Sequence, residues 1–167
     1  MISTLKESLW NQFGASIDML KNAIEMQPEQ RWHSDKRFFY TAYHVLVFLD
    51  YYLTYPVKEI SSPLPFTITE TDLPAEALDD ILPNRIYSKQ ELLGYLNANR
   101  EKCRQLISSL TEQKMNERWI NEWGKNYSLL EMLLYNMRHV QHHAAQLNMM
   151  LRQEINNAPD WVSRVVN

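Results

Sequence analysis

Three of the five histidines, His139, His142 and His143, fall within about one turn of a single predicted helix. His139 and His143 are four residues apart, so both imidazoles project from the same helix face. His44 lies at a similar depth in an earlier helical segment. If these helices pack side by side, the imidazoles of His44, His139 and His143 meet at mid-bundle. Neutral imidazoles suit a divalent metal such as zinc or nickel, with coordination positions left open for water or substrate.

The spacing alone leaves a second interpretation open, in which the three imidazoles are core histidines held by hydrogen bonds. No charge partner for them is apparent in the sequence, although buried polar groups need partners. His142 is rotated by about 100° from His143 and falls on a neighbouring, more polar face. The chain has neither a His-Glu-x-x-His motif nor a Glu-x-x-His pair on a helix, which argues against a metalloprotease helix and a ferritin-like di-iron site.

Four long segments carry apolar residues at the helical period, and they must position these histidines. The segments cover approximately residues 4–27, 35–55, 88–110 and 128–156. Each has a capping signal at its start: the boxes Thr4 with Glu7, Ser88 with Glu91 and Ser128 with Glu131, and either Ser34 or Asp35 for the second segment. The sequence therefore predicts an all-α four-helix bundle that forms a single domain over residues 1–167.

Residues 56–87, between the second and third segments, hold five prolines and are too long for an ordinary helix–helix connection. A stretch of this length can cross one end of the bundle and let the second and third helices run parallel. We expect a short helix at residues 75–82 within this crossover. Its acidic residues fit a solvated loop face: Glu70, Asp72, Asp79 and Asp80. Residues 111–127 are expected to fold over one end, and Cys103 to be a small core residue.

Composition excludes several function classes. Apolar residues make up 45% of the chain and charged residues 22%, and the formal net charge of −3 argues against a phosphate-gripping nucleic-acid-binding domain. The three isolated glycines cannot build a phosphate loop. The longest apolar stretch, residues 43–53, is interrupted by Asp50 and is too short to span a bilayer. With a single cysteine and no signal-peptide pattern, we expect a soluble, reduced, cytoplasmic protein with no nucleic-acid or membrane partner.

Three segments resemble the DinB-like (DinB/YfiT) superfamily of metal-binding four-helix bundles. They are Phe-Tyr-Thr-Ala-Tyr-His-Val-Leu-Val-Phe-Leu at 39–49, Tyr-Ser-Lys-Gln-Glu-Leu-Leu at 87–93, and His-Val-Gln-His-His-Ala-Ala-Gln-Leu at 139–147. The resemblance implies an up-down-down-up bundle, often dimeric, with a divalent metal held by His44, His139 and His143. Ala144 and Ala145 stand where the better-characterised thiol transferases of this superfamily carry Arg and Gly.

The favoured hypothesis is a metal-dependent enzyme of the transferase or hydrolase type, acting on a low-molecular-weight thiol or another small molecule. Gln146, Asn136 and Tyr40 are candidates for supporting the ligands or lining a pocket. The alternative is a non-catalytic, stress-associated bundle with a structural or vestigial metal site. We also expect a homodimer, both from the resemblance and from aromatic residues outside the apolar stripes: Trp10, Trp32 and Trp161.

Overall fold

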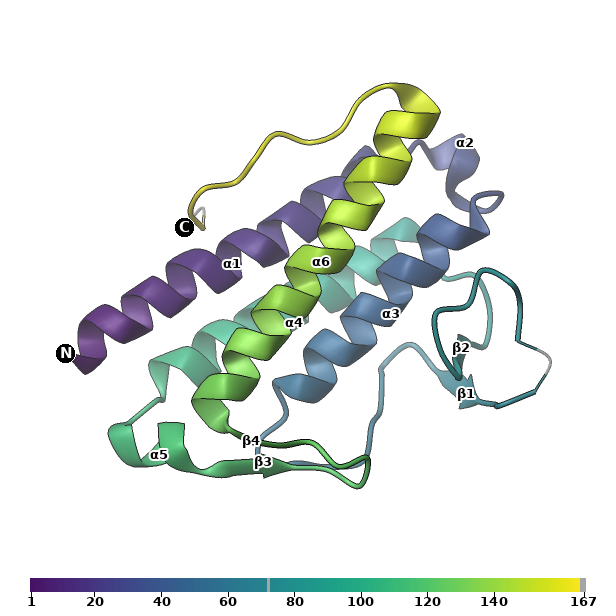
Figure 1. Cartoon of the computed structure of the whole chain (residues 1–167). Coiled ribbons are helices and arrows are strands. Elements are labelled where there is room, and N and C mark those ends of the chain that lie inside the picture. Colours follow the sequence, from purple (N-terminus) through teal and green to yellow (C-terminus); the bar gives the residue numbers. More distant parts are fainter. Residues whose placement is uncertain (72, 166–167) are drawn as a thin grey trace.

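Four long helices make up most of the described chain (Figure 1). The structure is a computed structural model and describes residues 1–71 and 73–165. The long helices are α1 (Ile2–Met26), α3 (Lys36–Tyr52), α4 (Lys89–Ser108) and α6 (Leu129–Ile155), and two short ones are α2 (Glu29–Trp32) and α5 (Glu112–Asn116). The predicted helical class is thus confirmed in its broad form.

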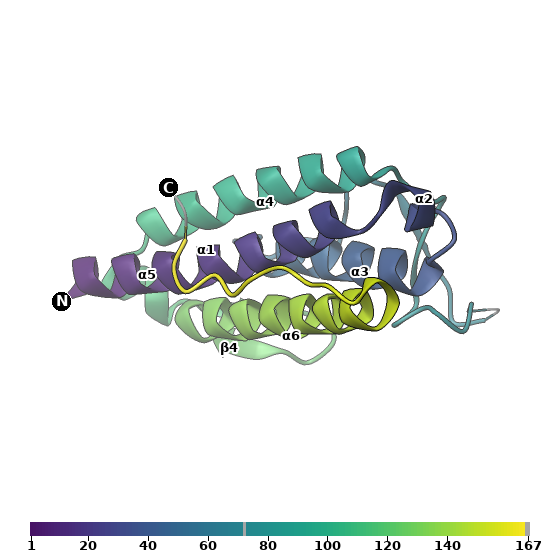
Figure 2. The same ribbon diagram turned by 90° about the horizontal axis from the view of Figure 1, so that it is seen from above.

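The core lies between the long helices, since α1 and α3 each pack against both α4 and α6 (Figure 2). Mostly apolar side chains at helical spacing fill this space because each long helix has one predominantly apolar face. Cys103 is fully buried among them, as predicted. The fully buried apolar side chains of the four helices include Phe13, Leu20, Phe39, Leu46, Leu96, Leu133 and Leu147.

Most of the predicted helix starts are confirmed. The Asp35 side chain accepts from the backbone N–H of Phe38, and Ser88 forms a reciprocal capping box with Glu91. Ser128 likewise accepts from the backbone N–H of Glu131. The predicted box at Thr4 is wrong, because helical hydrogen bonding already starts with Leu5 N–H donating to the carbonyl of Met1. Thr4 therefore lies inside the first turn rather than at the cap.

Two small antiparallel hairpins stand outside the helices. Strands β1 (Phe66–Ile68) and β2 (Ile81–Pro83) lie within the crossover, and β3 (Arg118–Ile120) and β4 (Asn126–Ser128) precede α6. The short helix expected at residues 75–82 is wrong, because Ile81 pairs with Ile68 in the first hairpin and is buried there. Pairing and burial of an isolated apolar residue outweigh weak helix propensity in so short a segment.

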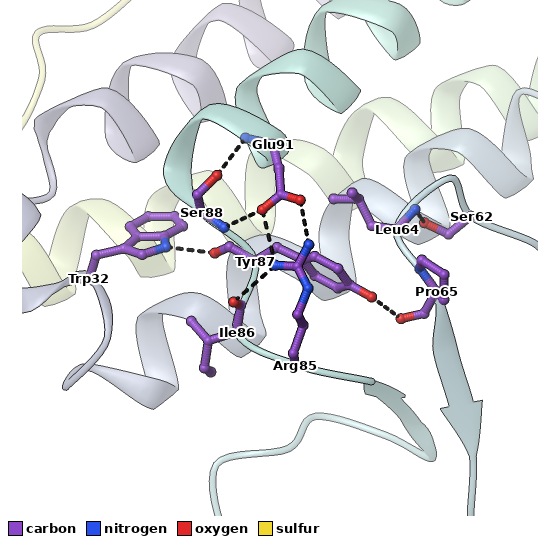
Figure 3. A network of polar contacts seen from close by, with 9 residues as sticks. All are labelled: Trp32, Ser62, Leu64, Pro65, Arg85, Ile86, Tyr87, Ser88 and Glu91. Atoms are coloured by element: carbon purple, nitrogen blue, oxygen red, sulfur yellow. Dashed lines mark hydrogen bonds and ion pairs between the residues drawn. The ribbon is translucent and has the colours of Figure 1, made fainter.

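A polar network around Tyr87 links the start of the first hairpin, at Pro65, to the end of the crossover (Figure 3). The Tyr87 hydroxyl donates to the carbonyl of Pro65 at 2.5 Å, which ties the start of the hairpin to its exit. The indole N–H of Trp32 donates to the carbonyl of Tyr87 at 2.8 Å. Arg85 pairs with Glu91, whose other partner is the cap of α4. The hairpin is consequently attached on both sides to helical parts of the structure.

After α6 the chain turns back and runs along α1 (Figures 1 and 2). The backbone N–H of Val165 donates to the carbonyl of Asn11 at 3.0 Å, and the Gln12 side chain donates to the carbonyl of Ser163. Val165 packs directly over Gly14, where a larger residue would leave no room for it. Among the described residues, no helix combines the length and the apolar character that crossing a membrane would require.

Candidate metal centre

The structure brings His44 of α3 together with His139 and His143 of α6. The Nε2 atom of His139 lies 3.2 Å from Nε2 of His44 and 3.1 Å from Nε2 of His143. One nitrogen from each ring therefore faces the same small space. The helical period explains the pair on α6, and the packing of α3 against α6 supplies the third ring.

The opposite ring nitrogens of two of these histidines face oxygen atoms. The Nδ1 atom of His143 donates to the side-chain Oε1 of Gln146 at 2.7 Å. The Nδ1 atom of His44 lies 2.6 Å from the carboxylate Oδ2 of Asp79, in the crossover. A proton on each Nδ1 leaves an unshared electron pair on Nε2, which is the form in which imidazole binds a metal. The Nδ1 atoms of His139 and His44 are both buried and neither has a partner with hydrogen-bond geometry among the described residues, so Asp79 meets His44 as a close ion-pair contact.

Helix α3 is held in register by two buried asparagines from its neighbours. The Asn136 amide donates to the carbonyl of Leu49, and the Asn99 amide of α4 donates to the carbonyl of Leu46, each at 3.1 Å. Both carbonyls lie within about a turn and a half of His44 on the same helix. The Asn136 hydrogen bond fixes the height of His44 relative to α6, and the Asn99 bond fixes α3 relative to α4.

Burial keeps two imidazoles of α6, those of His139 and His143, neutral. It lowers the pKa of His139 to about 3, and the neighbouring rings of His143 and His44 add to the effect. Burial also lowers the pKa of His143 to about 4, and the nearby His44 acts in the same direction, against the hydrogen bond to Gln146. Neutral imidazole is the ligating form, so at neutral pH these two rings are ready to coordinate without first releasing a proton.

The donor set fits a divalent metal ion. Zinc–nitrogen bonds of about 2.0–2.1 Å place neighbouring ligand nitrogens roughly 3.0–3.4 Å apart. The two Nε2 separations that involve His139, 3.1 and 3.2 Å, fall in this range, and all three ligand atoms lie within 4.8 Å of one another. Three nitrogen electron pairs turned toward one another repel unless a proton or a cation lies between them. The site is thus a three-histidine group that could hold a metal ion.

Aromatic rings and a shallow cavity border the three histidines. The rings of Phe48 and Tyr52 contact the His139 ring edge-on, and the Tyr135 ring packs against that of Tyr52. Burial raises the pKa of the Tyr52 hydroxyl, so that this hydroxyl stays protonated and can donate. A cavity of about 490 Å³ reaches His139 and is lined by Tyr135, Arg138, His139, Gln141 and His142.

The remaining sequence candidates occupy different places. Gln146 touches His143, whereas Asn136 bonds to the backbone of α3 and makes no polar contact with the histidines. Tyr40 lies one turn before His44 and packs edge-on against Phe39. Among the described residues, no hydrogen bond joins Tyr40 to the site. His142 is exposed at the cavity, as its helical phase predicts.

Asp79 is the site neighbour that sequence reasoning missed. The acidic residues of the crossover were expected to form a solvated face, but the Asp79 side chain turns inward and is only 23% exposed. His44 therefore does have a charge partner. Glu70 and Asp80 are exposed as expected, and Asp72 lies outside the described residues.

The chain was compared with known protein families, curated proteins and solved structures. The model of the DinB superfamily matches residues 37–147, a span that starts at α3 and includes all three histidines. The chain belongs to the DinB superfamily. This agrees with the resemblance seen in its helical motifs. No curated protein and no solved structure matches this DinB-superfamily chain.

Proposed function

We propose that this chain is a divalent-metal-dependent enzyme of the transferase or hydrolase type. His44, His139 and His143 would hold the ion, with zinc or nickel as the most suitable metals for three imidazoles. The observation that carries the proposal is the convergence of three imidazole nitrogens: Nε2 of His139 lies 3.2 Å from that of His44 and 3.1 Å from that of His143, and all three ligand atoms lie within 4.8 Å of one another. A metal held by three protein ligands keeps coordination positions open and makes a bound water or thiol acidic enough to act as a nucleophile near neutral pH.

The surrounding residues support access by a small molecule. The cavity beside His139 offers Tyr135, Arg138 and Gln141 as polar contacts for a substrate. Phe48 and Tyr52 pack edge-on against the His139 ring and would limit the access of water to it. A low-molecular-weight thiol is the substrate class we propose to test first, since a thiol is both small and a good metal ligand.

We propose the up-down-down-up bundle as the frame of this site. The pairing of α1 and α3 with both α4 and α6 supports it, and so do the polar contacts that attach the long crossover between α3 and α4. In this frame the two ligand helices, α3 and α6, are neighbours that run in opposite directions. We further propose a homodimer located in the cytoplasm.

Metal analysis of the purified protein, combined with a thermal-shift screen of low-molecular-weight thiols, tests the function. We expect about one divalent ion per chain and a thiol-dependent rise in melting temperature that disappears when the metal is removed. A protein without stoichiometric metal contradicts the proposal. A protein that retains metal but responds to no thiol or exogenous ligand supports the non-catalytic alternative, a bundle with a structural or vestigial metal site.

A further inference from the structure

The contact between Asp79 and His44 joins two parts of the chain that are 35 residues apart, the crossover and helix α3. Oδ2 of Asp79 lies 2.6 Å from Nδ1 of His44, and both side chains are largely covered, at 23% and 15% exposed. Nε2 of the same ring is the atom that faces His139. Asp79 thus approaches His44 from the side opposite the converging nitrogens.

The crossover hairpin holds the Asp79 carboxylate in this orientation. Its other oxygen, Oδ1, accepts from the backbone N–H of Ile81 at 2.9 Å. Ile81 is itself fixed by pairing with Ile68 and by burial at 6% exposed, and β2 packs against α3. The carboxylate is thus oriented by backbone before any ion binds, at little entropic cost on binding.

We infer that Asp79 is a positioning residue that holds the His44 ring with its proton on Nδ1 and its Nε2 electron pair turned toward the metal site. This inference rests on the proposed metal-binding function. A carboxylate on the far nitrogen of a ligating histidine fixes the ring orientation and raises the basicity of the ligating nitrogen. Gln146 provides the corresponding contact for His143 as a neutral amide, so Asp79 is the charged member of the pair.

The matched pair Asp79→Asn and Asp80→Asn tests this role by metal affinity. Asp80 is adjacent and exposed, so its variant makes the same chemical change away from His44. In chelator competition with zinc or nickel, Asp79→Asn should bind about 10- to 100-fold more weakly than Asp80→Asn while keeping one ion per chain at saturation. Asp79→Glu, which keeps the carboxylate, should recover part of the loss. Equal affinity of the two asparagine variants, within about twofold, would overturn the inference.

A second measurement decides the inference even if the wild-type chain binds no metal and the proposed function fails. Long-range proton–nitrogen spectra of the metal-free protein at about pH 8 report which ring nitrogen carries the proton. The His44 signals are assigned by their loss in His44→Gln. We expect the proton on Nδ1 in the wild type and in Asp80→Asn, and a mixture of the two tautomers in Asp79→Asn. A wild-type His44 with its proton on Nε2 contradicts the inference.

Discussion

His143 and Gln146 are linked within one turn of α6 by a hydrogen bond of 2.7 Å from the ring Nδ1 to the side-chain Oε1. Because an amide oxygen only accepts, this contact assigns the ring proton to Nδ1. The Nε2 of His143, 3.1 Å from that of His139, is therefore the nitrogen with a free electron pair. The link lies between residues three positions apart, so local helix geometry alone presents His143 to the site.

Removing this acceptor should weaken metal binding. We expect Gln146→Leu to lower zinc affinity by about tenfold, because the His143 ring loses the contact that fixes its tautomer and orientation. Gln146→Glu keeps an oxygen at this position and should bind within a few-fold of the wild type. Chelator competition measures both zinc affinities. An unchanged zinc affinity in Gln146→Leu would show that the helix alone orients the His143 ring.

The ligand set itself can be tested by alanine substitution. His44→Ala, His139→Ala and His143→Ala should each abolish stoichiometric metal, since two imidazoles hold a divalent ion much less tightly than three. His142→Ala should retain most of it, because this exposed ring lies on another face of α6. Elemental analysis after extensive dialysis gives the stoichiometry. Loss of metal in His142→Ala with retention in His139→Ala would demand a different ligand set.

The metal-free protein should stay folded at neutral pH, because the core residues on its four long helices do not depend on the site. Its stability should fall in acid. The pKa of His139 is about 3 in the folded chain and about 6.5 when unfolded, so below pH 6.5 the unfolded state binds a proton that the folded state does not. The free energy of unfolding should thus drop by up to about 1.4 kcal/mol per pH unit for this group.

Urea unfolding of the chelated protein between about pH 7 and pH 5 measures this slope. His139→Gln should flatten it, because the variant has no imidazole to protonate on unfolding. His33→Gln removes an exposed imidazole instead and should leave the slope nearly unchanged. Equal slopes for the wild type and His139→Gln would show that His139 takes up no extra proton on unfolding.

The segment after α6 can be tested at Gly14. A Cβ added there would lie 2.5 Å from Cγ2 of Val165, so Gly14→Ala must displace the segment from α1. We expect a loss of about 1–3 kcal/mol in unfolding free energy. Gly94 lies in α4 with open space around it, and Gly94→Ala should instead stabilise by about 0.5–1 kcal/mol. Denaturant unfolding of the two variants gives the contrast, and the same sign for both would contradict the packing described.

A homodimer remains our expectation for the state in solution. Of the tryptophans that motivate it, Trp32 is buried in its own chain and the Trp10 ring lies under the Arg100 guanidinium. Trp161 is 69% exposed, so Trp161→Ala should weaken dimer formation. Light scattering over a concentration range measures it, with Trp123→Ala as a control for loss of another exposed indole. A mass near 19.9 kDa at all micromolar concentrations would contradict the dimer.

The long helices and the shared face of His139 and His143 were predictable because both depend on local periodicity. Capping at Asp35, Ser88 and Ser128 follows from side chains within three residues of the amides they satisfy. The His139 and His143 pair follows from the helical repeat in the same way. Among the long helices, a local pattern failed at Thr4, where backbone hydrogen bonds begin earlier than the capping box indicates.

The crossover was not predictable in this way. Its strand pairing places Ile81 opposite Ile68, which lies 13 residues earlier in the chain. No alternation of apolar and polar residues predicts so short a hairpin. The inward turn of Asp79 depends on that pairing and on the packing of β2 against α3. In the sequence Asp79 looks no different from Asp80, since their different environments arise only when distant segments meet.

The Asp79–His44 contact has a thermodynamic consequence for the surface of the protein. Ion binding and docking of the hairpin share this contact, so the two equilibria are linked. If docking of the hairpin raises the affinity for the ion by some factor, the bound ion raises the docking equilibrium constant of the hairpin by the same factor. The described residues of this loop, 69–71 and 73–80, are exposed or half-buried and lie at the end of this linkage. Occupancy of a buried centre would thereby be transmitted to an external loop, where amide exchange or a second protein can sense it.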